Sequence, residues 1–216
     1  MRGVWKLTVT ACLMLGLVSV ALAQRGGMGF GGGLGFLAMN PSAQKEIKVT
    51  DDQKDKLKDA MTKVREDHKD DFAKFRDLSQ EEKQKLMKTF SDESDKALGK
   101  VLDDKQMNRL RQIGLQQQGA AAFGNPEVQK KLKLTDDQKE KIKTINEDFD
   151  KERGEIFQSM QGGGDREEAM KKFATLRTET LDKVKTLLTD DQKKTWESMT
   201  GAPFEVKFEG RRGGGA

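Results

Sequence analysis

The sequence predicts an all-α protein built from two tandem helical-hairpin units, with glycine-rich segments at both ends. Residues 40–54 are matched by residues 125–139, and helix-start signals recur at corresponding places in both copies. Apolar residues follow these signals at steps of three and four, as on one face of a helix. Charged residues make up 35% of the chain and aromatic residues 6%, which is typical of long solvated helices rather than of a thick globular core.

The first 23 residues have the pattern of a secretory signal peptide. Arg2 and Lys6 accompany an apolar run that ends at Leu22, and the small residues required for cleavage lie just before the Ala23–Gln24 bond. An uncleaved membrane anchor is the alternative, because the uncharged run has about the minimum length of a spanning helix. We expect cleavage, export and no stable membrane span in the mature chain.

The mature chain would carry nearly balanced charge and no cysteine. Without Arg2 and Lys6, 38 of the 40 basic residues remain against 36 acidic ones. These charges are interspersed and lack the one-sided basic clustering that nucleic-acid binding needs, so we expect no nucleic-acid partner. Cys12 lies inside the signal peptide, so packing rather than disulfides must stabilise the mature protein.

The repeat divides the mature chain into two units. The offset is 85 at the start of each unit and 86 further on, and the extra residue fits the Gly162–Gly164 turn. Unit 1 therefore spans residues 40–118 and unit 2 residues 125–203, with a linker at 119–124. The glycine-rich residues 24–39 predict a flexible leader. Residues 204–216 predict an extended Gly/Arg-rich tail, whose alternating start suggests a short strip lying on the helices.

Helix-start signals define the elements of each unit in order. Asn40-Pro41 and Asn125-Pro126 predict short first helices, since Asn caps a helix and Pro fits its first turn. Two further starts per unit place Thr or Asp at the N-cap and Gln three residues later. Such a capping box contributes about 1 kcal/mol. The predicted boxes are Thr50 with Gln53, Asp103 with Gln106, Thr135 with Gln138, and Thr189 with Gln192.

Between the two boxes of each unit, the apolar pattern predicts an antiparallel hairpin of two long helices. The first helix is expected to run from Asp51 through Leu78 in unit 1, and from Asp136 through Met160 in unit 2. A third helix follows the second box of each unit. One hairpin alone would leave half of its apolar stripe in water, so unit 1 is expected to bury its stripe against unit 2.

The repeated boxes resemble the LTxxQ motif of the Spy/CpxP group, small exported proteins of the bacterial periplasm. The resemblance rests on Val49–Gln53, Leu134–Gln138 and Leu188–Gln192, and on Leu102–Gln106, where Asp103 replaces Thr. It covers residues 40–203 and implies a periplasmic all-α protein, here two Spy-like units fused as a covalent pseudo-dimer. It also implies an ATP-independent chaperone or envelope-stress modulator that holds unfolded or partly folded proteins. The alternatives are a structural or regulatory protein with one dedicated envelope partner, and a metal-responsive periplasmic protein.

No motif predicts catalysis or a cofactor. The chain has no nucleophile elbow, P-loop or dinucleotide fingerprint, and no His/Cys cluster suited to a transition metal. We therefore predict no enzyme activity, no cofactor and no metal. The single histidine, His68, corresponds to Arg153 in unit 2 and is expected to be a satisfied or half-exposed polar residue. Methionines on the stripes are expected in the core, although methionine also suits promiscuous surfaces: Met61, Met87, Met107, Met160, Met170 and Met199.

Overall fold

The computed structural model describes residues 33–207, which are helical and contain no β-strand. The all-α prediction is confirmed for this part of the chain. The predicted signal peptide, its cleavage bond and most of the glycine-rich ends lie outside the described residues. The helices are α1 (Leu34–Ala38), α2 (Pro41–Glu46), α3 (Asp51–Asp67), α4 (Lys69–Ala73), α5 (Gln80–Leu98), α6 (Asp104–Gln118), the 3-10 helix η2 (Gly119–Gly124), α7 (Pro126–Leu132), α8 (Asp136–Gln161), α9 (Arg166–Thr186) and α10 (Asp190–Thr200).

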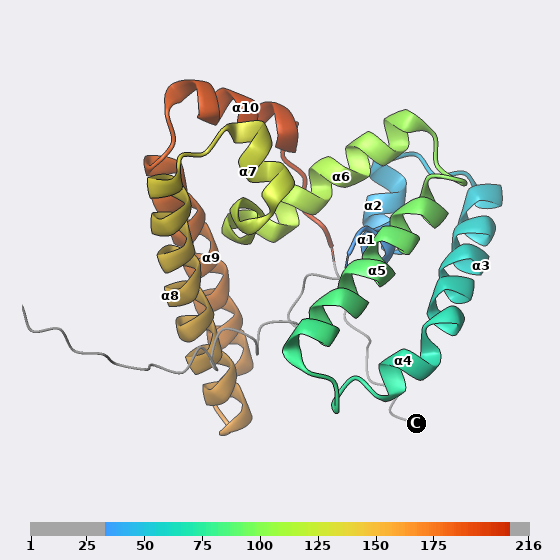
Figure 1. Cartoon of the computed structure of the whole chain (residues 1–216), viewed down its shortest axis with the longest axis horizontal. Coiled ribbons are helices and arrows are strands. Elements are labelled where there is room, and N and C mark those ends of the chain that lie inside the picture. The colour runs from blue at the N-terminus through green and yellow to red at the C-terminus, as the bar shows by residue number, and fades with distance from the viewer. Residues whose placement is uncertain (1–32, 208–216) are drawn as a thin grey trace, which may run out of the picture.

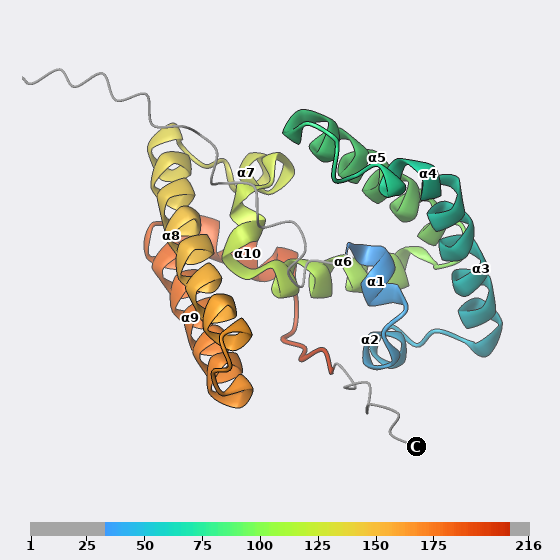
Figure 2. The ribbon, with the colours of Figure 1, turned by 90° about the horizontal axis from the view of Figure 1, so that it is seen from below.

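Two helical hairpins flank a central group of helices. α3 packs on α5 in one hairpin, and α8 packs on α9 in the other. In Figure 1, both hairpins extend to the same side of the central α6, α7 and α10. Figure 2 shows that the two hairpins are not parallel to each other. The main contacts of each hairpin are with its own partner helix and with α1 or η2, not with the other hairpin. The expected burial of one unit's stripe against the other is therefore wrong.

The core of unit 1 includes a segment that the sequence analysis assigns to a flexible leader. α1 packs against α5 and α6, and its Leu37 and Ala38 are 3% and 0% exposed. Glycine permits this close packing, because a Cβ on Gly35 would lie 2.5 Å from the Met61 methyl carbon. The leader prediction is thus wrong for residues 34–38. The buried core consists of Leu37, Ala38, Ile47, Leu57, Met61, Leu98, Leu102, Met107, Leu110, Ile113 and Val206.

The core of unit 2 likewise includes the predicted linker. η2 packs against α8 and α9, and Phe123 is fully buried with its ring 4.3 Å from that of Trp196. η2 and α1 hold corresponding places, because Gln129 donates to the Phe123 carbonyl as Gln44 does to the Ala38 carbonyl. The repeat therefore begins before residue 40. The core consists of Ala120, Ala122, Phe123, Val128, Leu132, Leu134, Ile142, Val184, Leu188 and Trp196.

The first hairpin helix is continuous in unit 2 but broken in unit 1. α8 runs for 26 residues, whereas α3 ends at Asp67 and α4 forms little more than one turn. The predicted helix from Asp51 through Leu78 is therefore wrong beyond Asp67. His68 lies at the break with φ −105° and ψ 7°, and its ring points into the hairpin, where it contacts Phe90 of α5.

The two units contact each other through their third helices. α10 packs on α6, and Gln116 of α6 donates to the carbonyls of Thr200 and Ala202 at 2.7 and 2.8 Å. Arg177 of α9 donates to the carbonyls of Gln116 and Gln117, both at 2.8 Å, near the end of α6. The bonds to Thr200, Gln116 and Gln117 satisfy carbonyls that a helix end leaves without an intrahelical partner. None of the helices in residues 33–207 has both the length and the apolar character of a membrane span.

Candidate functional site

The structure places a complete capping box at each of the four predicted starts. The N-cap oxygen of Thr50, Asp103, Thr135 or Thr189 accepts from the Gln backbone amide three residues later, at 2.9–3.3 Å. The Gln side chain accepts in turn from the N-cap amide. The aspartates that follow are exposed and pair with lysines of the same helix at 2.6–3.5 Å in α3, α8 and α10. The boxes therefore stabilise helix starts and form no acid–base pair.

The glutamines of the boxes also bond to one another, which the sequence analysis did not anticipate. Gln53 donates to Gln106 at 2.8 Å and accepts from it at 3.0 Å, and Gln138 and Gln192 repeat this pair at the same distances. We call each reciprocal pair a glutamine clasp. Gln53 also donates to the Val101 carbonyl and Gln138 to the Leu187 carbonyl. Each clasp thus joins the start of the first hairpin helix to the start of the third helix.

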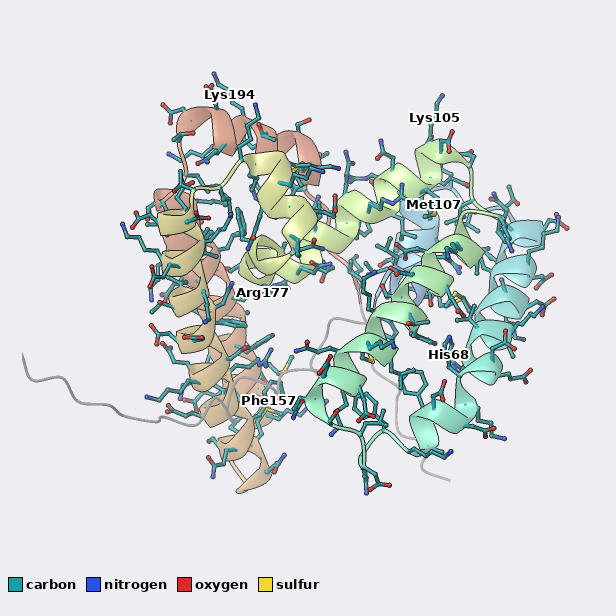
Figure 3. The ribbon with its side chains drawn as sticks, viewed as in Figure 1. His68, Lys105, Met107, Phe157, Arg177 and Lys194 are labelled. Carbon is teal, nitrogen blue, oxygen red and sulfur yellow. The ribbon has the colours of Figure 1, made fainter. Side chains whose placement is uncertain are left out.

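His68 is a buried structural residue at the break between α3 and α4. It is 7% exposed, and its Nε2 lies 2.8 Å from Glu93 Oε2 on α5. Its ring makes edge contacts with Phe72 and Phe90, and Figure 3 shows it between the two arms of the hairpin. Arg153, its counterpart, pairs with Asp150 at 3.0 Å instead. The expected satisfied polar role holds at Nε2 but not at Nδ1, and the residue is buried rather than half-exposed.

A shallow pocket of about 320 Å³ adjoins His68. The Nδ1 atom of His68 is buried without a hydrogen-bond partner and lies 3.5 Å from Asp71 Oδ2. The lining mixes carboxylates, lysines and leucines, so it presents no concentration of one charge: His68, Asp71, Lys74, Leu78, Glu82, Lys85, Leu86 and Thr89. Within residues 33–207, no group of three or more His, Cys, Asp or Glu residues is placed to hold a metal ion.

The distal half of the unit 2 hairpin carries apolar side chains that stay partly exposed. α8 and α9 make their main contacts with each other and with η2, which lies beside the proximal half of both helices. The rings of Phe149 and Phe157 lie 6.2 and 5.9 Å from the Phe173 ring, yet all three remain partly exposed. Figure 3 shows Phe157 near the end of the hairpin. We define tip surface 2 as Phe149, Ile156, Phe157, Met160, Met170 and Phe173.

The distal half of the unit 1 hairpin has a similar surface. Phe72 contacts Phe90 edge-on at 5.1 Å and stacks on Phe75 at 6.1 Å, and none of the three is fully buried. Lys83 lies over the Phe75 ring at 5.7 Å, which places a cation at the edge of this apolar patch. We define tip surface 1 as Phe72, Phe75, Leu78, Met87 and Phe90.

The methionines divide between the core and the tip surfaces. Met61 and Met107 are buried in the unit 1 core, as predicted. Met87 and Met170 are 42% and 39% exposed, so the prediction of core positions is wrong for them. The physical reason is that α1 and η2 cover only the proximal part of each hairpin. The apolar stripes therefore continue beyond the elements that would bury them.

Comparison with known proteins identifies no relative. No family model matches this chain, and neither a curated protein nor a solved structure matches it. The resemblance to the Spy/CpxP group therefore stays a prediction that rests on the four boxes and their spacing. All four clasp glutamines were predicted as box residues but their pairing was not, and Glu93 beside His68 was not predicted at all. The sequence did contain a signal for the clasps. Gln recurs at the same position in both boxes of each unit, and the hairpin between the two boxes brings the starts of their helices together.

Proposed function

We propose that this protein is an exported, Spy/CpxP-like binding protein that holds unfolded or partly folded proteins without ATP. The observation that carries the proposal is the pair of tip surfaces, where aromatic and methionine side chains stay partly exposed on two separate hairpins. Methionine adapts its shape to different apolar partners, which suits a surface that must accept many sequences.

The charges around the tip surfaces support weak and reversible binding. Lysine and acidic side chains alternate along both hairpins in exposed pairs such as Lys88–Asp92, Lys171–Glu167 and Lys172–Glu168. Exposed pairs of this kind contribute little to stability, so they exchange readily with charges on a partner. Mixed charge accelerates encounter with partners of either sign, and the small apolar patches limit the lifetime of each complex.

The proposal is tested by aggregation of a reduced model substrate in the absence of ATP. We expect the mature chain to suppress light scattering at a several-fold molar excess over the substrate. The full chain with Met87→Gln and Met170→Gln should suppress it less, because both changes remove adaptable apolar area from exposed positions. Gln84→Ala with Gln158→Ala is the matched control on the same hairpins, and it should act like the wild type.

The competing function is that of a regulatory protein with one dedicated envelope partner. A dye that fluoresces on exposed apolar surface distinguishes the two. Dye binding that falls in the Met87→Gln, Met170→Gln chain supports a general holding surface. If the native protein binds no dye and leaves aggregation unchanged at several-fold excess, the holding function is wrong and the dedicated partner is favoured.

A further inference from the structure

The segment after α10 crosses from unit 2 to unit 1 and is held there through its main chain. We call residues 202–207 the strap. Arg109 and Gln116 of α6 donate to the Ala202 carbonyl at 2.9 and 2.8 Å, and Gln116 also accepts from the Phe204 amide at 2.8 Å. At the far end, the Lys207 amide donates to Ser42 Oγ at 3.0 Å, and Asn40 donates to the Lys207 carbonyl at 2.9 Å.

Only two strap side chains contact the core. Val206 is 7% exposed and belongs to the unit 1 core, and Phe204 packs against that core while partly buried. Glu205 and Lys207 are exposed. The bound segment thus has an apolar–x–apolar pattern, in which alternate side chains of an extended chain face the protein.

These contacts are the kind by which proteins bind extended peptides. Main-chain hydrogen bonds supply affinity whatever the sequence, and pockets for alternate side chains select for apolar residues. The strap site consists of the polar residues Asn40, Ser42, Arg109 and Gln116 beside the apolar residues around Val206. Nothing in the five hydrogen bonds depends on the identity of the strap side chains.

The strap can leave without breaking a helix. It has no regular secondary structure, and it starts after Gly201, whose φ of 63° ends α10 and turns the chain towards α6. This φ, with ψ −160°, is strained for any residue that carries a side chain, so glycine is needed for this turn. The hydrogen bonds from Gln116 and Arg177 to helix ends would still connect the units.

We propose that the strap site binds extended apolar–x–apolar segments of non-native proteins, and that the strap is their internal competitor. The inference rests on the proposed holding function and assigns it a second, more selective site. A strap in the same chain has a high effective concentration, so it would keep the site closed to weak ligands. A partner chain with many such segments, as an unfolded protein offers, would compete with it.

The test uses the full mature chain and a fluorescent peptide of the strap sequence Ala-Pro-Phe-Glu-Val-Lys, blocked at both ends. Phe204→Ser with Val206→Ser weakens the internal strap without touching the site. We expect this variant to bind the peptide at least about tenfold more tightly than the wild type, measured by anisotropy. A peptide with Ser in place of Phe and Val should not bind. Glu205→Ser with Lys207→Ser alters only exposed strap side chains and should match the wild type.

A further substitution locates the binding. Gln116→Ala, added to the Phe204→Ser, Val206→Ser chain, removes one acceptor and one donor for the peptide main chain, and should lower peptide affinity several-fold. If circular dichroism shows that the Phe204→Ser, Val206→Ser chain has lost helix, the milder change Val206→Ala replaces it. This variant should also bind the peptide more tightly than the wild type, and adding Gln116→Ala should again lower the affinity.

The outcomes separate this inference from the proposed function. Unchanged peptide affinity in a folded strap variant overturns the inference, even if the wild type suppresses aggregation. Exchange of straps between two copies, seen as concentration-dependent dimers that bind no peptide, overturns it as well. Peptide binding by the strap variant, with no suppression of aggregation by any chain, supports the strap site and contradicts the holding function.

Discussion

At the scale of single residues, each box glutamine has two structural roles. Gln53 closes the capping box at Thr50 and also bonds to Gln106, which is nearly buried. A polar group in such a place costs free energy when it loses its partner, more than the bond itself contributes. The clasp therefore makes the start of α3 and the start of α6 depend on each other.

A double-mutant cycle on the unit 1 clasp measures this dependence. Gln53→Ala should lower the free energy of unfolding by about 1–3 kcal/mol, because it removes both clasp bonds and leaves the Gln106 amide only its longer bond to the Lys48 carbonyl, at 3.3 Å. Gln53→Ala with Gln106→Ala should cost less than the sum of the single changes, by about 0.5–3 kcal/mol. Urea unfolding measures both, with exposed Gln158→Ala as the control. Additive costs would contradict the clasp.

Asp95 gives a pH-dependent prediction. Burial raises the pKa of this carboxyl above its ordinary value of 3.8, with Asp92 adding to the effect and Arg111 opposing it, and Oδ1 has no hydrogen-bond partner. The folded protein therefore binds this proton more tightly than the unfolded chain does, so the stability lost to the ionised carboxylate grows as the pH rises from 3.8 and is complete above the folded pKa.

Replacing Asp95 by Asn removes that charge. The melting temperature should rise at a pH above the folded pKa, where the carboxylate is ionised in both states. The gain should shrink as the pH falls through the folded pKa and disappear below 3.8, where the acid is neutral folded or unfolded. Melting curves across this range, with exposed Asp59→Asn as reference, provide the check. A gain that persists at low pH would mean that the charge is not its cause.

The sequence could predict the interactions between residues that are close in the chain, but not those between distant residues. A capping box needs only two residues three apart, so all four could be predicted from the chain alone. The Gln53–Gln106 bond joins residues 53 positions apart, and it exists only because the hairpin returns the chain. The half-buried position of Asp95 is equally nonlocal, and its counterpart Leu181 shows that the repeat gives no guide to it.

At the scale of elements, the glycine-rich and alanine-rich connectors proved to be structural. Composition predicts flexibility for residues 33–39, yet the same small residues let α1 approach α5 and α6 closely. η2 does the same in unit 2 through Ala122 and Phe123. Composition could not distinguish a flexible glycine from one that permits contact, because the difference lies in what packs against it.

The long hairpin of unit 2 should be unequally stable along its length. Ile142 near the start of α8 is buried, whereas no residue at positions 149–160 is buried. A two-helix hairpin without a third element buries too little apolar surface to resist local opening. Native-state hydrogen exchange should therefore be at least about tenfold faster for amides in residues 149–160 than around Ile142. Uniform protection along α8 would contradict this expectation.

At the scale of the whole molecule, the two units are joined by residues that the repeat does not share. Arg177 of unit 2 reaches the end of α6, but its counterpart in unit 1 is Ser91. Arg109 and Gln116 correspond to Thr195 and Ala202. An internal repeat predicts what the copies have in common, so it could not predict how one copy contacts the other.

Arg177 is the residue whose loss should separate the units most. Its guanidinium donates to two carbonyls near the end of α6, and burial lowers its pKa without a nearby carboxylate among the causes. Hydrogen bonds from a charged donor are stronger than neutral ones, at about 1.5–3 kcal/mol each. Figure 3 shows the side chain directed from α9 towards η2 and α6, where the two units adjoin.

Calorimetry of Arg177→Ala tests this connection. We expect one cooperative transition in the wild type and a broadened or split transition in the variant, because each unit keeps its own core but loses a link to the other. Arg177→Lys retains the charge without the planar fork, and should be intermediate. Arg166→Ala, an exposed change on the same helix, should unfold like the wild type. An unaltered transition in Arg177→Ala would show that packing of α6 against α10 suffices to join the units.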